Sequence, residues 1–342
     1  MFQLRNFLLL FLLFILIVGG TIFFALNLRP VSTDKTQSIL EISQGMSFNQ
    51  IVNQLHDKGL IRSSKIFKAF ALLSGQAHQF KPGEYFLSPN LSSKEIINYL
   101  TNGPKEISIT IIPGRTLKEI DDLLSSSGVI KKGDLIGLSV NEVFSVDQDK
   151  YFFLKDKKTL EGFLLPDTYR FLPGETAKTV ALKILDNFEA KALQSFKKGA
   201  SINVKEDFDY KTLILASLLE KEIPVYEDQR IAAGIFQKRL KIGMPLQIDA
   251  CILYAKCDGR FINCSTLQKE DFKIDSPYNT YLNKGLVPTP ISNPSSSTIE
   301  AAANPIPSDY LYYLAKPKTN QTIFSKTFEE HNRNRYQYLL NN

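Results

Sequence analysis

The sequence has no tryptophan, and among its 342 residues it has only three cysteines and three histidines. So few cysteines exclude a small protein built around disulfides, and so few histidines argue against a zinc enzyme. The net charge is +6, yet no block of basic residues occurs, so the concentrated positive surface of a nucleic-acid-binding protein is missing. With 44% hydrophobic and 22% charged residues, the chain is typical of a globular protein of about two domains. Its mild positive charge is compatible with an acidic polymer or an anionic membrane surface as partner.

The motifs of several common enzyme classes are also absent. The sequence contains no nucleophile elbow, no phosphate-binding loop and no cluster with the spacing of zinc ligands. Cys251, Cys257 and Cys264 are separated by five and six residues, which is not the short spacing of a zinc site. In an oxidising compartment Cys257 and Cys264 could form a disulfide, and free buried thiols are the alternative. The sequence therefore predicts neither a metal nor an organic cofactor.

One long apolar run is present at the beginning of the chain. From Phe7 to Leu28 no residue is charged, and a helix of this length spans about 33 Å, enough to cross a bilayer. Because no small-x-small cleavage site follows, we expect an uncleaved transmembrane helix at 7–28, with residues 1–6 as a cytoplasmic tail and 29–37 as a linker. Arg5 precedes the run, so the positive-inside rule favours an exported body. No other apolar run approaches this length.

A small α+β pattern occurs twice after the linker. Residues 38–42 alternate as a strand does, and a glycine turn and an amphipathic helix follow, with a capping box that begins at Ser47. The same order recurs at an offset of 69 residues, with a strand at 107–112 and a capping box that begins at Thr116. A further helix is expected from Ser92 to Leu100. The repeated order predicts a small α+β module.

The second half of the chain, from about residue 160, is expected to be mainly helical with irregular connections. The predicted helices lie at 176–196, 208–222, 227–240, 296–303 and after Thr327. The loop at 274–295 is rich in proline and glycine. The overall fold class is therefore α+β.

A candidate general acid ends the most apolar of these helices. Residues 211–219 are apolar nearly all round, which predicts a buried helix, and Glu220 follows directly. Desolvation there would raise the carboxyl pKa toward the range of a general acid, whereas a solvated helix end is the plain alternative. Glu222 is two positions further, about 200° around the helix, so we expect it to point elsewhere.

Other polar residues allow both a functional and a structural interpretation. In residues 275–281, tyrosines alternate with Asn, Thr and Asp, which suits a sugar-binding cleft, although Pro and Asn also make rigid loops. Glu161 and Asp167 could line such a cleft, but helix capping and turn formation explain them as well. His331 is expected to be a packed or capping residue.

Several long motifs resemble those of the endolytic murein transglycosylases, the MltG or YceG-like family, in the order in which that family carries them. They are residues 160–169, 216–222, 239–247, 276–281, 291–294, 301–305, 309–312 and 330–332. The resemblance implies a single-pass enzyme of the inner membrane, with a short cytoplasmic N-terminus and a periplasmic body. It implies a LysM-like module at 38–105 and a YceG-like catalytic domain at 106–342. Peptidoglycan strands would be the substrate, peptidoglycan synthases possible partners, and no cofactor would be needed.

The resemblance also assigns site residues. Glu220 matches the catalytic glutamate, and the candidate substrate-binding residues are Gln247, Asp249, Ser276, Tyr278, Asn279, Thr280 and Tyr281. The implied reaction cleaves the bond between N-acetylmuramic acid (MurNAc) and N-acetylglucosamine (GlcNAc) in nascent strands, gives 1,6-anhydro ends and so terminates elongation. The alternatives are a muramidase that uses Asp249 and water, and a non-catalytic scaffold that binds peptidoglycan.

Overall fold

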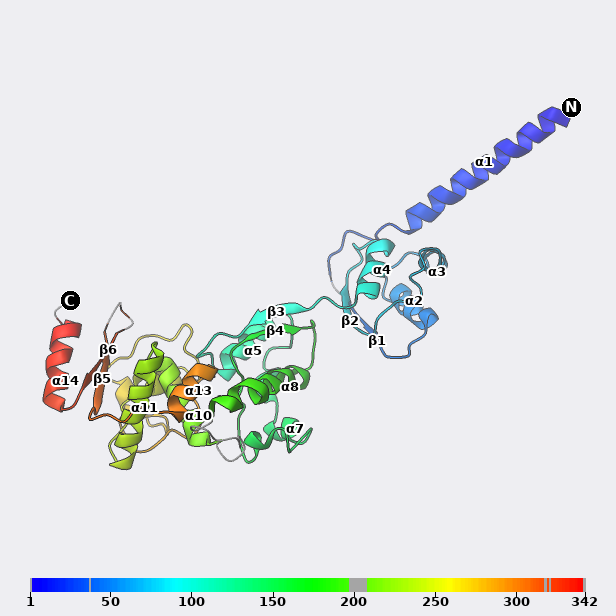
Figure 1. Cartoon of the computed structure of the whole chain (residues 1–342). Helices are drawn as coiled ribbons and strands as arrows, with labels where there is room; N and C mark the ends of the chain where they lie inside the picture. Colours follow the sequence, from blue (N-terminus) through cyan, green and yellow to red (C-terminus); the bar gives the residue numbers. More distant parts are fainter. Residues whose placement is uncertain (1, 37, 197–207, 317–318, 320, 341–342) are drawn as a thin grey trace. The chain divides into compact units, whose positions relative to one another are not determined.

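The computed structural model describes residues 2–36, 38–196, 208–316, 319 and 321–340. Residue 1 of the expected tail and residue 37 of the expected linker lie outside these ranges. The fold is α+β, as the sequence predicts: helices dominate, and the strands of the described residues form three two-stranded sheets. The chain divides into two compact units, one of residues up to Ile107 with Leu172–Gly174, the other of the remainder (Figure 1).

The first unit begins with a long helix, α1 (Phe2–Asn27). Its apolar side chains are largely exposed, with Phe14, Leu16 and Phe23 each more than 60% accessible. No helix in the part of the chain that the structure describes is long and apolar enough to cross a membrane.

A small α+β body follows α1. Its elements are β1 (Ser38–Ile42), α2 (Phe48–Asp57), α3 (Ser64–Leu73), β2 (Gly83–Leu87) and α4 (Ser93–Asn102). β1 pairs antiparallel with β2, and the helices supply most of a core that includes Leu40, Val52, Leu55, Ile96 and Leu100. The capping box predicted at the start of α2 is present. The sequence did not predict α3.

The second unit contains the remaining elements, whose bounds complete the fold. They are β3 (Ile107–Thr110), α5 (Leu117–Ser126), α6 (Asp134–Gly137), α7 (Val140–Phe144), η1 (Phe152–Leu154), β4 (Thr168–Phe171), α8 (Ala177–Asn187), η2 (Phe188–Ala192), η3 (Leu193–Phe196), α10 (Tyr210–Glu222), α11 (Tyr226–Lys241), α12 (Asp249–Lys256), η4 (Asp271–Lys273), α13 (Ser296–Ala303), β5 (Tyr312–Ala315), β6 (Thr322–Ser325), α14 (Phe328–Arg335) and η5 (Tyr336–Leu340). β3 pairs with β4, and α5 has the predicted capping box at Thr116.

The core of the second unit is built around α10. Eight consecutive residues of α10, from Thr212 to Leu219, are buried, because α11, α12 and α13 pack against it. α11 approaches the chain after α13 closely at Gly234, where an added Cβ atom would clash with the carbonyl oxygen of Ile306. The apolar run of α10 therefore forms a buried helix, as its sequence predicts.

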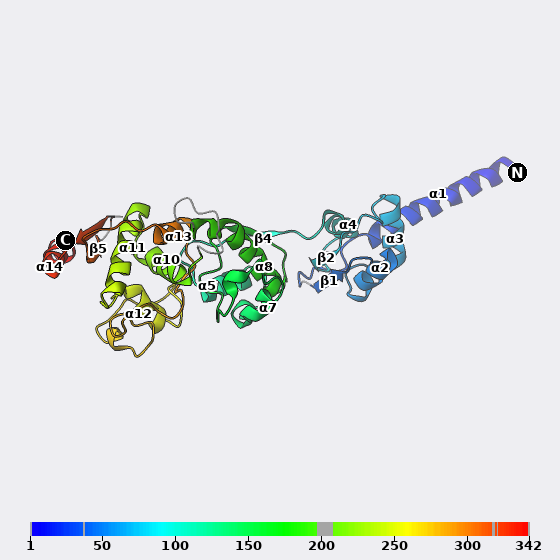
Figure 2. The ribbon, with the colours of Figure 1, turned by 60° about the horizontal axis from the view of Figure 1, so that its bottom comes forward.

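A hairpin and a helix follow α13. β5 pairs antiparallel with β6, and α14 packs against both strands, as Figure 1 and Figure 2 show. Thr327 caps α14 through a hydrogen bond that its side chain accepts from the Glu330 N–H. The sequence predicted the helix after Thr327 but not the hairpin.

A disulfide joins Cys257 to Cys264 and closes the loop after α12, while Cys251 is free and buried. The loop is tied to α5, because the backbone N–H groups of Phe261 and Ile262 both donate to the carboxylate of Glu119. The sequence left open whether Cys257 and Cys264 pair or remain free thiols, and the structure has them paired.

Candidate active site

The two glutamates at the end of α10 have different surroundings. One carboxylate oxygen of Glu220 accepts hydrogen bonds of 2.9 Å from the backbone N–H and the hydroxyl of Ser295, the N-cap residue of α13. The neighbouring Lys221 lies over the ring of Phe261 and donates to the carbonyl of Gly114. Glu220 thus ties α10 to the start of α13.

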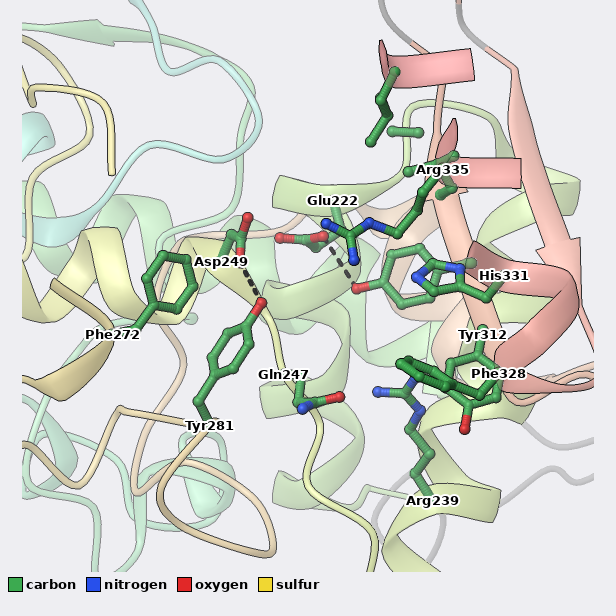
Figure 3. Close-up of a pocket in the computed structure, with 14 residues that line it drawn as sticks. Glu222, Arg239, Gln247, Asp249, Phe272, Tyr281, Tyr312, Phe328, His331 and Arg335 are labelled. Carbon is green, nitrogen blue, oxygen red and sulfur yellow. Dashed lines mark hydrogen bonds between the residues drawn. The ribbon is translucent and has the colours of Figure 1, made fainter. Parts of the chain in front are cut away.

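Glu222 points into a pocket of about 600 Å³. The lining residues are Glu222, Arg239, Gln247, Asp249, Phe272, Tyr281, Tyr312, Tyr313, Leu314, Ala315, Phe328, His331, Arg335 and Leu339. Figure 3 shows Glu222 and Asp249 near the middle of this pocket, between Tyr281 on one side and the α14 side chains on the other. Glu220 is not among the residues that line it.

The carboxyl group of Glu222 is adapted to carry a proton. It accepts hydrogen bonds from the Ala250 N–H and the Tyr313 hydroxyl, at 3.3 and 3.1 Å. Burial, and to a lesser degree the nearby charge of Asp249, raises the pKa of Glu222 to about 7, although these hydrogen bonds act in the opposite direction. A carboxyl group with this pKa can both donate and accept a proton near neutral pH.

The floor of the pocket is formed by the start of α12 and the loop before it. Asp249, the first residue of α12, accepts a hydrogen bond of 2.6 Å from the Tyr281 hydroxyl. Gln247 has a left-handed backbone with φ of 52°, which a non-glycine residue rarely adopts. Its N–H donates to the carbonyl of Thr280, and the Ile248 N–H donates to the Thr280 hydroxyl. These bonds fix the direction in which Gln247 and Asp249 face the pocket.

The other wall of the pocket comes from β5 and α14. The ring of Tyr312 stacks on His331 with centroids 5.3 Å apart and also contacts the ring of Phe328. Arg239 lies over Tyr312 and donates to the backbone carbonyls of Pro245, Leu246 and Leu311. Aromatic rings with few aliphatic groups between them are suited to binding sugar rings.

The structure brings together only part of the predicted site. Gln247, Asp249 and Tyr281 line the pocket. The other predicted residues are not among those that line it; they are Ser276, Tyr278, Asn279 and Thr280. Asn279 is fully buried and donates to the carbonyls of Phe272 and Ile274. The hydroxyl of Tyr278 bonds to that of Thr289. For these four residues the rigid-loop interpretation describes the observed contacts.

Glu161 and Asp167, the other carboxylates that the sequence offered for the cleft, make structural contacts. Glu161 is buried, and burial raises its pKa to about 8. It accepts hydrogen bonds from the Leu117 N–H and from the side-chain amide of Asn293. Asp167 pairs with Lys191, whose hydrogen bond lowers the pKa of Asp167 to about 2. Neither residue lines the pocket around Glu222.

The sequence interpretation did not include Glu222, or the wall formed by β5 and α14, in the candidate site. The signals were present, because Glu222 belongs to the motif 216–222, Tyr312 to the motif 309–312 and His331 to the motif 330–332. What the sequence did not show is that the β5–β6 hairpin returns to the end of α10.

The fold and the pocket define an α+β protein with a proton-carrying carboxyl group in an aromatic-lined cleft. A family model described as the YceG-like family matches residues 40–337. The match covers most of the chain, and the chain therefore belongs to the YceG-like family.

Similar proteins have names that describe an activity. A Bacillus subtilis protein named endolytic murein transglycosylase is 33% identical over 337 residues, which cover 95% of this chain and 91% of that protein. A Streptococcus pneumoniae protein of the same name, from strain D39, is 28% identical, and the match covers 90% of this chain and 60% of that protein. The crystal structure of a yceG-like protein from Listeria monocytogenes matches with a TM-score of 0.56 and 31% identity, over 88% of this chain and 99% of that one.

Proposed function

We propose that this chain is an endolytic murein transglycosylase, which cleaves glycan strands of peptidoglycan between MurNAc and GlcNAc and leaves 1,6-anhydro ends. Its membership of the YceG-like family and the names of its relatives support the activity. The observation that carries the mechanism is Glu222, a carboxyl group with a pKa of about 7 in a pocket lined with aromatic rings.

The reaction needs one group that acts first as an acid and then as a base. Glu222 donates its proton to the glycosidic oxygen as the bond from MurNAc C1 to that oxygen breaks, through an oxocarbenium-like transition state. The carboxylate then takes the proton of the MurNAc C6 hydroxyl, whose oxygen forms the new bond to C1. Every proton is accounted for and no water is consumed. The acid is restored at the end of the cycle.

The pocket also supplies groups that hold and orient the sugars. Phe272 and Tyr281 form one aromatic wall, with ring centroids 4.8 Å apart, and Tyr312 contributes to the other. The carboxylate of Asp249 and the amide of Gln247 face the pocket between these walls. Sugar hydroxyls and N-acetyl groups bond to such polar groups, while ring faces pack on aromatic side chains.

Two matched variants test which glutamate acts, because the sequence favoured Glu220 and the pocket favours Glu222. We expect Glu222→Gln to reduce turnover by about 10³-fold, the middle of the range for loss of a general acid and base, and Glu220→Gln to retain most of it. The measurement is mass spectrometry of muropeptides released from purified peptidoglycan. Loss of activity only in Glu220→Gln would instead support the assignment from the sequence.

The same experiment separates the rival functions. Internal anhydro-MurNAc ends would establish a lytic transglycosylase, whereas reducing ends would establish a muramidase in which Asp249 assists attack by water. Equal lack of cleavage by the unmodified chain and both variants would favour a scaffold that only binds peptidoglycan.

We also propose that residues 7–28 anchor the chain in the inner membrane, with the body in the periplasm. The charge-free run and the exposed apolar side chains of α1 support this. Deleting residues 1–30 should move the chain from the membrane fraction to the soluble fraction. Retention in the membrane fraction would contradict the anchor.

The α+β body of residues 38–105 is proposed as a LysM-like module that contacts glycan. That peptidoglycan synthases are partners remains a prediction.

A further inference from the structure

The pocket carries a positive charge that the proposed reaction does not use. Arg335 extends from α14 and points into the pocket toward Glu222, as Figure 3 shows. Within the described residues no hydrogen bond and no ion pair engages its guanidinium group. The groups that act on the pKa of Glu222 are burial, the Ala250 N–H, Asp249 and Tyr313, and Arg335 is not one of them.

The other basic side chains of the same wall, Arg239 and His331, are not free to pair with a charged ligand. Arg239 is 4% exposed and is committed to three backbone carbonyls. Burial and the two neighbouring arginines lower the pKa of His331, so at neutral pH this side chain is uncharged. Arg335 is therefore the cation of this wall that is free to pair with a bound ligand.

The geometry points to Arg335 as the residue that binds the carboxylate carried by the MurNAc residue at the cleavage point. This inference rests on the proposed function and names a recognised group of the same substrate. In a peptidoglycan strand, MurNAc differs from GlcNAc by the lactyl group on its C3 oxygen, which ends in a carboxylate or in an acidic peptide. A guanidinium group binds a carboxylate with two parallel hydrogen bonds and so fixes both position and direction.

The consequence is that Arg335 selects the sugar that enters the pocket. A glycan has two kinds of glycosidic bond, and the reaction requires MurNAc on the side of the bond whose C1 is attacked. A cation on the wall beside Glu222 stabilises the binding register that places an acidic MurNAc beside Glu222. GlcNAc has no carboxylate, so its binding is not stabilised in this way. Arg335 is thus a positioning residue that sets specificity, and the proton transfers remain with Glu222.

The test compares Arg335→Gln with Arg333→Gln, because Arg333 lies on the same helix but does not line the pocket. The full-length chain in detergent is assayed on three glycans: strands with peptide stems, strands stripped of stems that keep the lactyl carboxylate, and stripped strands whose lactyl carboxyl is converted to a methylamide. We expect Arg335→Gln to raise KM about tenfold, the equivalent of one charge-assisted hydrogen bond, with kcat nearly unchanged. Arg333→Gln should behave as the unmodified chain.

The three glycans decide between sources of the carboxylate and expose a wrong inference. A raised KM for stem-bearing strands alone assigns the pairing to a peptide carboxylate, and a raised KM for stripped strands alone assigns it to the lactyl carboxylate. A raised KM for both shows that Arg335 pairs with whichever carboxylate the MurNAc residue carries. For the unmodified chain, KM should be about tenfold higher on the amidated strands than on the stripped strands that keep the carboxylate. On the amidated strands, Arg335→Gln should raise KM no further. An unchanged KM, or a fall in kcat with a displaced pH profile, would overturn the inference. Lack of cleavage by the unmodified chain would instead count against the proposed function itself.

Discussion

At the scale of single residues, the two glutamates at the end of α10 illustrate how position alone divides roles. Glu220 bonds to Ser295, the N-cap residue of α13, where a carboxylate is favoured by the free N–H groups of the helix. Glu222 lies in the pocket, where burial raises its pKa. Two carboxylates separated by one residue therefore lie in different surroundings, and the proposed function assigns the proton transfers to Glu222.

The raised pKa of Glu222 predicts how activity depends on pH. The first step needs the protonated acid, so we expect kcat to fall as the pH rises above about 7, the pKa of this group. The measurement is the rate of anhydro-end formation between pH 5 and pH 9. A rate that keeps rising up to pH 9 would contradict Glu222 as the acid.

The same shift predicts an effect on stability with a definite sign. The folded-state pKa of Glu222 is raised above the value of 4.5 for an ordinary glutamate, so the folded protein holds the proton more tightly, and stability falls as the pH rises from about 4.5 to about 7. We expect Glu222→Gln to raise the free energy of unfolding by about 1–2 kcal/mol at pH 8 and by little at pH 4.5.

Glu220→Gln is the matched control in this measurement. It weakens the bonds to Ser295 and is expected to lower stability at pH 8 by about 1 kcal/mol. Chemical denaturation at both pH values measures the two effects. The same change in both variants would indicate that the environment described for Glu222 is wrong.

At the scale of elements, a single buried amide connects segments that are distant in sequence. Asn293 accepts hydrogen bonds of 2.8 Å from the N–H groups of Gly162 and Leu164, and it donates to Glu161 and to the carbonyl of Arg115. The amide therefore links the loop before α13 to two other irregular segments, at Arg115 and at residues 161–164.

Removing this amide should be costly. Asn293→Ala leaves the buried N–H groups of Gly162 and Leu164 without an acceptor and removes one of the hydrogen bonds to Glu161. We therefore expect the free energy of unfolding to fall by about 3–4 kcal/mol. Asn283→Ala, at an exposed site with similar backbone contacts, should cost less than about 1 kcal/mol. Chemical denaturation measures both, and equal losses would contradict the role given to Asn293.

The disulfide makes a second prediction at the scale of elements. It closes a loop between residues seven apart in sequence, and such a short loop is stabilised by about 2 kcal/mol. The double variant Cys257→Ser, Cys264→Ser should lower the free energy of unfolding by that amount. Its stability should not respond to reductant, whereas that of the unmodified chain should fall. Insensitivity of the unmodified chain to reductant would show that the bond does not contribute.

At the scale of the whole molecule, the sequence predicted local structure better than the way in which distant segments meet. The capping boxes located α2 and α5, and the continuous apolar run located α10, because these patterns are read within a dozen residues. The short elements α12, β5 and β6 have no comparable pattern. They depend on contacts that join distant parts of the chain.

The same distinction applies to where the predicted site residues lie in the structure. Gln247, Asp249 and Tyr281 were predicted because they lie in recognisable motifs, and the structure brings them into one pocket. The helical angle correctly indicated that Glu222 points away from Glu220, but not that the pocket lies on that side. Only the pairing of β5 with β6 and the packing of α14 create that side of the pocket.

The late position of this wall in the chain has a consequence for the timing of synthesis. The carboxyl group of Glu222 is made about ninety residues before Tyr313, which bonds to it. Until β5 and α14 fold onto the end of α10, that carboxyl group lacks this wall and is more exposed to water, which lowers its pKa toward that of an ordinary glutamate. A nascent chain that has folded only as far as α13 is thus expected to hold the catalytic proton less tightly. Cutting of glycan would begin only when the last part of the fold is in place.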